Sequence, residues 1–167
     1  MRVARHGAGR TNQKLYFAKM AMQQLEQATD AAVIQATYEA GVFHLHGAFL
    51  ALLQELSRFY KQSPQLPSAE ALRLALDVKG QVSPEIVQIQ QVESPDQWLG
   101  QLQQAFHDCQ LAPEPPEPQP EAELPDSLIL RVTTAAAEPA SELERLQRWY
   151  KHLQTMINDF RREMVEF

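Results

Sequence analysis

Histidines are the first side chains to consider for metal or acid–base chemistry, and the chain has five of them. His44 and His46 are two residues apart in a stretch whose pattern predicts a helix, so their side chains point about 200° apart and cannot face one ion. A di-iron bundle would need a glutamate three residues before a histidine, and no histidine has one there. We therefore expect no metal site and no cofactor. His46 is expected to pack in the core, and His44 to donate a hydrogen bond to a neighbouring helix.

Cys109 is the only cysteine, which excludes a disulfide within the chain and a multi-cysteine zinc site. It lies near the expected end of a helix and next to Asp108. The helix dipole and the carboxylate both disfavour a thiolate, so we expect a raised pKa and a structural, half-buried thiol. The sequence also has no phosphate-binding loop and no Gly-x-Ser-x-Gly motif.

Arg145 and His152 have the spacing used by small helical ribonucleases of the HEPN type, in which four to six residues separate an arginine from a histidine. Leu146 follows the arginine, where those ribonucleases usually have a polar residue. The pair also lies on a regular amphipathic helix, so we interpret it as a solvated helix face. A HEPN-like ribonuclease using Arg145 and His152 is kept as the alternative function.

The N-terminal part of the chain is basic, because five arginines and lysines precede the first acid, Glu26. Positive charge at the start of a helix is unfavourable by about 0.3–1 kcal/mol per charge, so helix formation does not select these residues. Three interpretations remain: a solvated arm, pairing with an acidic linker or partner, and phosphate binding at a helix N-terminus. The candidate partner-binding residues are Arg10, Asn12, Gln13 and Lys14.

The elements that position these residues are predicted to be helices. Residues 1–10 carry two glycines and no apolar period, so we expect a flexible basic arm that ends at an N-cap, Thr11. Apolar side chains then recur every three or four residues through a helical bundle over 11–111, with Phe49 and Trp98 in its core. The helices of this bundle are expected at about 12–29, 31–62, 69–79, 84–92 and 95–110, the last three preceded by the N-caps Ser68, Ser83 and Ser94.

The composition changes after this bundle. Residues 112–127 contain six prolines and five acids without a base, which predicts an extended acidic linker. The β-prone segment 128–134 is expected to lie as an extended strap. Residues 141–167 form a helix that begins with a Ser141–Glu144 capping box and carries a heptad seam, and we expect it to dock on the bundle, on the long second helix. The fold class is therefore all-α, with five to six helices.

Four sequence segments resemble a family of small proteobacterial proteins of unknown function: RTNQKLYFA, FHLHGAFLALLQELSRFY, SPDQWLGQL and LERLQRWYKHLQTMINDFRREM. The resemblance covers the chain from Arg10 onward. It implies a helical protein without an assigned activity, so it transfers no catalytic residues.

Composition limits the function further. The net charge of −6 gives no reason to expect nucleic-acid binding by the whole chain. No apolar run is long enough to cross a membrane, and no apolar region follows the basic N-terminus as in a signal peptide, so we expect a cytoplasmic protein. We interpret it as a non-catalytic protein-interaction or regulatory module that binds a protein partner or itself. A structural homodimer built on the heptad seam is a further alternative.

Overall fold

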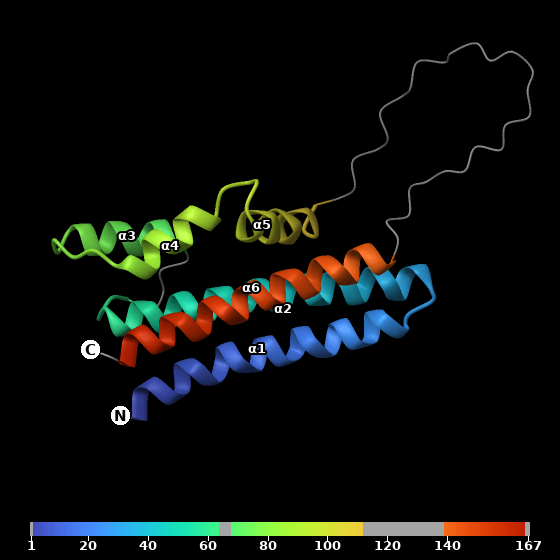
Figure 1. Ribbon diagram of the computed structural model, residues 1–167, viewed down its shortest axis with the longest axis horizontal. Helices are drawn as coiled ribbons and strands as arrows, with labels where there is room; N and C mark the ends of the chain where they lie inside the picture. Colours follow the sequence, from blue (N-terminus) through green and yellow to red (C-terminus); the bar gives the residue numbers. More distant parts are fainter. Residues whose placement is uncertain (1, 64–67, 112–138, 166–167) are drawn as a thin grey trace, which may run out of the picture.

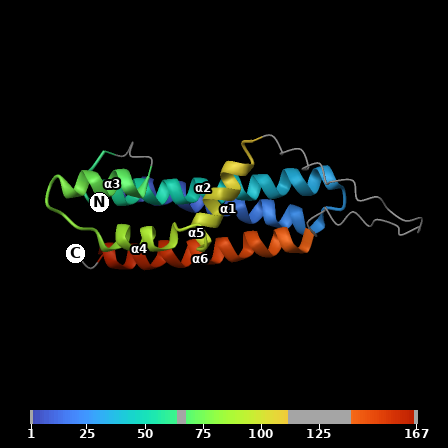
Figure 2. The same cartoon turned by 90° about the horizontal axis from the view of Figure 1, so that it is seen from above.

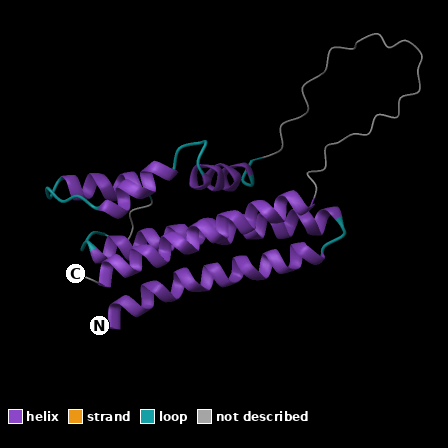
Figure 3. Ribbon diagram, in the orientation of Figure 1, coloured by secondary structure: helices purple, strands orange, loops and turns teal. Residues whose placement is uncertain are grey.

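The computed structural model describes residues 2–63, 68–111 and 139–165, and within these ranges every regular element is an α-helix (Figures 1 and 3). The predicted all-α bundle is confirmed. The six helices are α1 (Arg2–Gln27), α2 (Ala31–Phe59), α3 (Ala69–Asp77), α4 (Pro84–Val92), α5 (Trp98–Asp108) and α6 (Pro139–Val165). None of these helices is long and apolar enough to cross a lipid bilayer.

The three long helices form an elongated bundle. α2 runs antiparallel to α1, and α6 runs parallel to α2 and contacts both of them (Figures 1 and 2). The short helices α3, α4 and α5 form a second layer over α2 and α6, so α1 lies on the opposite side of the molecule (Figure 1). Among the described residues, one flank of α1 therefore has no covering helix.

α2 is the centre of the core, as its broad apolar stripe predicts. Phe49 is buried, and Gly41 provides the space for α6, because a Cβ atom there would lie only 2.6 Å from Cδ1 of Leu146. Gly41 therefore marks a place where a neighbouring helix approaches closely. The apolar α2 side chains with no exposed surface are Val42, Leu45, Ala48, Leu52 and Leu56.

The heptad seam of α6 is buried against α1 and α2 of the same chain. Its buried members are Leu146, Leu153, Ile157 and Phe160. Trp149 lies one position outside the strict heptad pattern and is nevertheless completely buried, so the apolar stripe of α6 is wider than a coiled-coil seam. The predicted capping box is not at the start of α6, because the helix begins two residues earlier at Pro139, a residue suited to the first helical turn.

Serine caps explain the starts of α3 and α4. The hydroxyl of Ser68 accepts a hydrogen bond from the backbone N–H of Ala71, and the hydroxyl of Ser83 accepts one from Ile86. The same prediction for Ser94 is wrong. Its hydroxyl instead donates to Asp96, and α5 begins only at Trp98.

The turn before α5 is tight, which explains the late start of the helix. A Cβ atom on Gly100 would lie 2.1 Å from the backbone oxygen of Ser94. Trp98 is consequently placed at the surface end of α5 and is only half-buried, so the prediction that it lies in the core is wrong.

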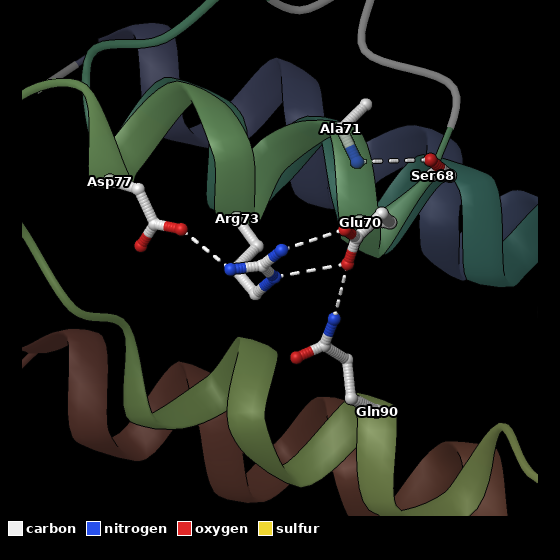
Figure 4. Close-up of polar contacts among 6 residues, drawn as sticks. All are labelled: Ser68, Glu70, Ala71, Arg73, Asp77 and Gln90. Carbon is white, nitrogen blue, oxygen red and sulfur yellow. Dashed lines mark hydrogen bonds and ion pairs between the residues drawn. The ribbon is translucent and has the colours of Figure 1, made fainter.

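Polar contacts hold α3 and α4 together at the surface (Figure 4). The guanidinium of Arg73 donates to both oxygens of Glu70, at 3.0 and 2.7 Å, and to a carboxylate oxygen of Asp77. The side-chain amide of Gln90 on α4 donates to Glu70 at 2.8 Å. These groups are exposed, so they orient the two helices more than they stabilise the fold.

A second polar contact joins the end of α2 to the start of α4. The hydroxyl groups of Tyr60 and Ser83 each donate to the same oxygen of Glu85 at 2.6 Å. Burial, with the bond to Glu85, raises the pKa of Tyr60 to about 12. The phenol therefore remains a hydrogen-bond donor across the physiological range.

The prediction of a flexible arm over residues 1–10 is wrong for the described part of that range, because α1 begins at Arg2. Thr11 is not an N-cap. It lies inside the helix, completely buried, and its hydroxyl donates to Glu55 of α2. Packing of this part of α1 beside α2 and α6 outweighs the low helix propensity of its glycines. The predicted linker at 112–127 and strap at 128–134 lie outside the described residues.

Candidate functional site

The four candidate residues at the start of the chain lie in the middle turns of a helix and not at its N-terminus. The backbone N–H groups around Arg10 are therefore not the unpaired donors of a first turn. This placement removes the geometric basis for phosphate binding at a helix N-terminus.

The four residues also point in two directions. Arg10, Gln13 and Lys14 lie on one side of α1, and the Arg10 guanidinium donates to the side-chain oxygen of Gln13. Asn12 lies on the other side, where its side-chain oxygen accepts a hydrogen bond of 2.9 Å from Arg161 of α6. The structure thus brings together three of the predicted residues and separates the fourth.

Asn12 belongs to a polar cluster that joins the three long helices. We call this cluster the three-helix clasp, and its members are Thr11, Asn12, Glu55 and Arg161. The Arg161 guanidinium donates to both carboxylate oxygens of Glu55, at 3.1 and 2.8 Å. The Glu55 side chain is only 9% exposed, and one of its oxygens also accepts the hydroxyl of Thr11. The clasp fixes the position of α6 along α1 and α2.

Sequence analysis did not predict the clasp. Its members come from three helices, and one of its pairs is separated by 106 residues. The available signal was Glu55, a single acid within the apolar stripe of α2 between Leu52 and Leu56. A charge in such a position requires a partner, but the sequence does not say which.

Lys14 is held between α1 and α2. Its ammonium nitrogen lies 4.5 Å from the centre of the Phe43 ring, and its methylene groups lie close to Gly47. Burial, with the charge of Arg10 nearby, lowers the pKa of Lys14. Neither Arg10 nor Lys14 has a carboxylate within 4.0 Å among the described residues.

Exposed apolar side chains surround these cations. Met20 is 41% exposed and Phe43 51%, and Tyr16, which points away from Lys14 on α1, is 60% exposed. The ring of Phe17 packs beside that of Tyr16, with 6.4 Å between their centres. We call this surface the basic aromatic face, formed by Arg10, Gln13, Lys14, Phe17 and Met20 of α1 and Phe43 of α2.

His44 lies beneath the basic aromatic face. Its ring meets Phe17 and Phe43 edge to face, with 5.3 Å between centres in both pairs. Its buried Nδ1 has no hydrogen-bond partner in the described part of the chain, so the predicted interhelical bond from this atom is not formed. Burial, followed by the charges of Lys14 and Arg10, lowers the pKa of His44.

His46 lies flat against Phe106 of α5, with 3.9 Å between ring centres and 8° between planes, but it is only half-buried, so the predicted core position is met in part. Burial lowers its pKa below the ordinary value of 6.5. No group of three or more potential metal ligands occurs among the residues that the structure describes.

This packing of His46 predicts a pH dependence of stability. Because its pKa is lower in the folded chain, the unfolded chain binds more protons, and the free energy of unfolding should fall as the pH decreases below 6.5. We expect His46→Phe, which keeps the stacked ring, to reduce this fall without abolishing it, because His44 contributes in the same direction. Urea unfolding at about pH 7.5 and about pH 5.5 measures the effect. An equal fall in both proteins would contradict the assignment to His46.

The structure separates Arg145 from His152. The Arg145 guanidinium lies over the rings of Trp149 and Tyr38, at 5.1 and 5.7 Å from their centres. His152 stacks on Trp98 and lines a different hollow of the surface. Neither a hydrogen bond nor a ring contact joins Arg145 to His152.

Cys109 is half-buried at the end of α5, as predicted. Burial, with the nearby Glu39 and Asp108, raises the pKa of its thiol. The environment is therefore that of an unreactive thiol.

Comparison with known proteins gives one match. Residues 5–167 match the model of DUF6586, a family of unknown function, and the chain therefore belongs to this family. Its predicted membership of a family of unknown function is confirmed. Searches among curated proteins and among solved structures find no match.

Proposed function

We propose that this member of a family of unknown function is a non-catalytic protein-interaction module that binds an acidic segment of a partner protein through the basic aromatic face. The observation that carries the proposal is the combination of cations and exposed apolar side chains on one surface of α1 and α2. Arginine, methionine and phenylalanine are enriched in protein interfaces, and this face contains all three.

The charge of the face supports an acidic partner. The chain as a whole has a net charge of −6, whereas α1 contains no acid before Glu26. Arg10 and Lys14 therefore form a local positive surface whose charges are not neutralised by a described carboxylate. A partner carboxylate placed there would relieve their mutual repulsion and give specificity through complementary charge.

The rings would supply affinity. Phe43 is large and exposed, and its ring lies beside those of His44 and Phe106. Aromatic side chains of this kind often dominate binding energies when a partner covers them. An acidic segment with one or two apolar side chains matches both properties of the face.

A pull-down with charge-reversed variants tests the proposal. We expect the wild type to capture a stoichiometric partner and Arg10→Glu, Lys14→Glu to capture it at least about 10-fold less well. The matched control is Lys61→Glu, Lys79→Glu, which changes the net charge equally at exposed lysines away from the face. Capture should persist in this control and weaken with salt.

Equal capture by both variants would contradict the proposal, because it would show that the basic aromatic face is not the binding surface. Circular dichroism of each variant should give the wild-type helix content. This control separates lost binding from lost folding.

A further inference from the structure

A groove of mixed polar and apolar lining runs along α6, beside α4 and the start of α5. Its volume is about 640 Å³. Most of its lining comes from one face of α6, and the facing wall is formed by Gln88 of α4 and Trp98 of α5. It does not include any residue of the basic aromatic face, so it is an independent surface.

Two parallel rings form part of the groove. The rings of Trp98 and His152 are inclined by only 13°, with 5.5 Å between their centres. Trp98 is half-buried and anchored on the core, whereas His152 is exposed on α6. Because the two rings stack on each other, the wall offered to a planar group is the outer face of the His152 ring, with Trp98 behind it. Aromatic side chains stack on nucleobases regardless of base identity.

Cations lie directly beside this wall. Arg148 and Lys151 are one turn or less from His152 on α6, and both are exposed. Within the described ranges neither has a carboxylate within 4.0 Å. Such cations attract a phosphate, which arginine can bind with two hydrogen bonds.

The remaining polar groups fit a ligand with hydrogen-bonding edges. Gln88, Gln147 and Thr155 line the groove and provide donors and acceptors. Two acids also line the groove, and neither forms an ion pair with Arg148 or Lys151 within 4.0 Å. Asp159 accepts a hydrogen bond of 3.0 Å from Arg162, and Glu144 lies a full turn before Arg148.

We propose that this groove binds a nucleoside phosphate, with the base stacked at the Trp98–His152 wall and the phosphate held by Arg148 and Lys151. A base joined to a phosphate is present both in a free mononucleotide and in one nucleotide of a single-stranded nucleic acid. The proposal does not depend on the protein-interaction function described above.

Calorimetric titration of the full chain with AMP tests this site. We expect AMP to bind the wild type and to bind Arg148→Gln, Lys151→Gln at least 10-fold more weakly. The matched control, Arg58→Gln, Lys79→Gln, removes two exposed cations outside the groove and should retain wild-type affinity. Absence of AMP binding, or equal affinity in both variants, would overturn the proposal.

Inorganic phosphate and His152→Ala test the stacking. We expect phosphate to bind at least 10-fold more weakly than AMP, and His152→Ala to weaken AMP binding several-fold while leaving phosphate binding unchanged. Equal affinity for phosphate and AMP would overturn the proposal, because the rings would then contribute nothing. A titration with hexauridylate distinguishes the two ligands. Tighter binding than AMP indicates that the groove binds a single strand, and weaker binding indicates that it binds a free nucleotide.

Discussion

A Trp149→Ala variant is expected to lose about 3 kcal/mol of its free energy of unfolding, the lower part of the usual range for deleting a buried tryptophan. Trp149 is completely buried where α6 packs on the bundle, and the Arg145 guanidinium covers its ring. We expect a loss of unfolding free energy at the low end of this range because the indole Nε1 of Trp149 is buried without a hydrogen-bond partner in the described part of the chain. Removing this unpaired donor relieves part of the loss of packing.

Urea unfolding followed by circular dichroism measures this loss, and two tryptophan variants serve as controls. Trp149→Phe should cost much less, because it keeps a ring and removes the unpaired donor. Trp98→Ala should also cost less, because that side chain is only half-buried. A Trp149→Ala variant as stable as the wild type would show that α6 does not pack on α1 and α2 as described.

The second large effect is expected from Glu55→Ala, which should cost about 2–3 kcal/mol. The change leaves the hydroxyl of Thr11 and the guanidinium of Arg161 without their shared acceptor. Breaking a fully buried ion pair costs more, but the Arg161 side chain is 26% exposed and regains some water.

A double-mutant cycle with Arg161→Ala isolates the pair. We expect the double variant to be more stable than the sum of the single effects predicts, by about 1–2 kcal/mol. Arg162→Ala is the matched control, because that arginine pairs with Asp159 at the surface and its loss should be close to neutral. If the losses of stability in the two single variants simply added in the double variant, Glu55 and Arg161 would not interact as the three-helix clasp requires.

Local signals explain what could be predicted from the sequence. The starts of α3 and α4 follow from Ser68 and Ser83, whose caps act within three residues. The apolar stripe of α2 predicts its burial, and Phe49 is indeed in the core. These features depend on neighbours in the sequence, so no knowledge of the rest of the fold is needed.

Features that depend on distant contacts could not be predicted. α1 extends to Arg2 alongside the end of α6, where the Ala8 carbonyl accepts a bond of 3.4 Å from Arg161. For the same reason, the sequence could not predict how the four candidate residues are placed. Composition identifies Arg10 and Lys14 as unusual, but only the packing shows that Asn12 faces α6 and that Phe43 is exposed.

The place of α6 in the bundle has a consequence for synthesis of the chain. The α1–α2 hairpin is complete at Phe59, whereas α6 begins 80 residues later at Pro139. At roughly 5–20 residues per second, a ribosome needs about 4–16 s to make the intervening chain. Throughout this interval the apolar seam of the nascent hairpin lacks the helix that covers it in the finished protein. The hairpin is therefore the stage at which a chaperone would protect the chain, and a translational pause before Pro139 should increase its aggregation.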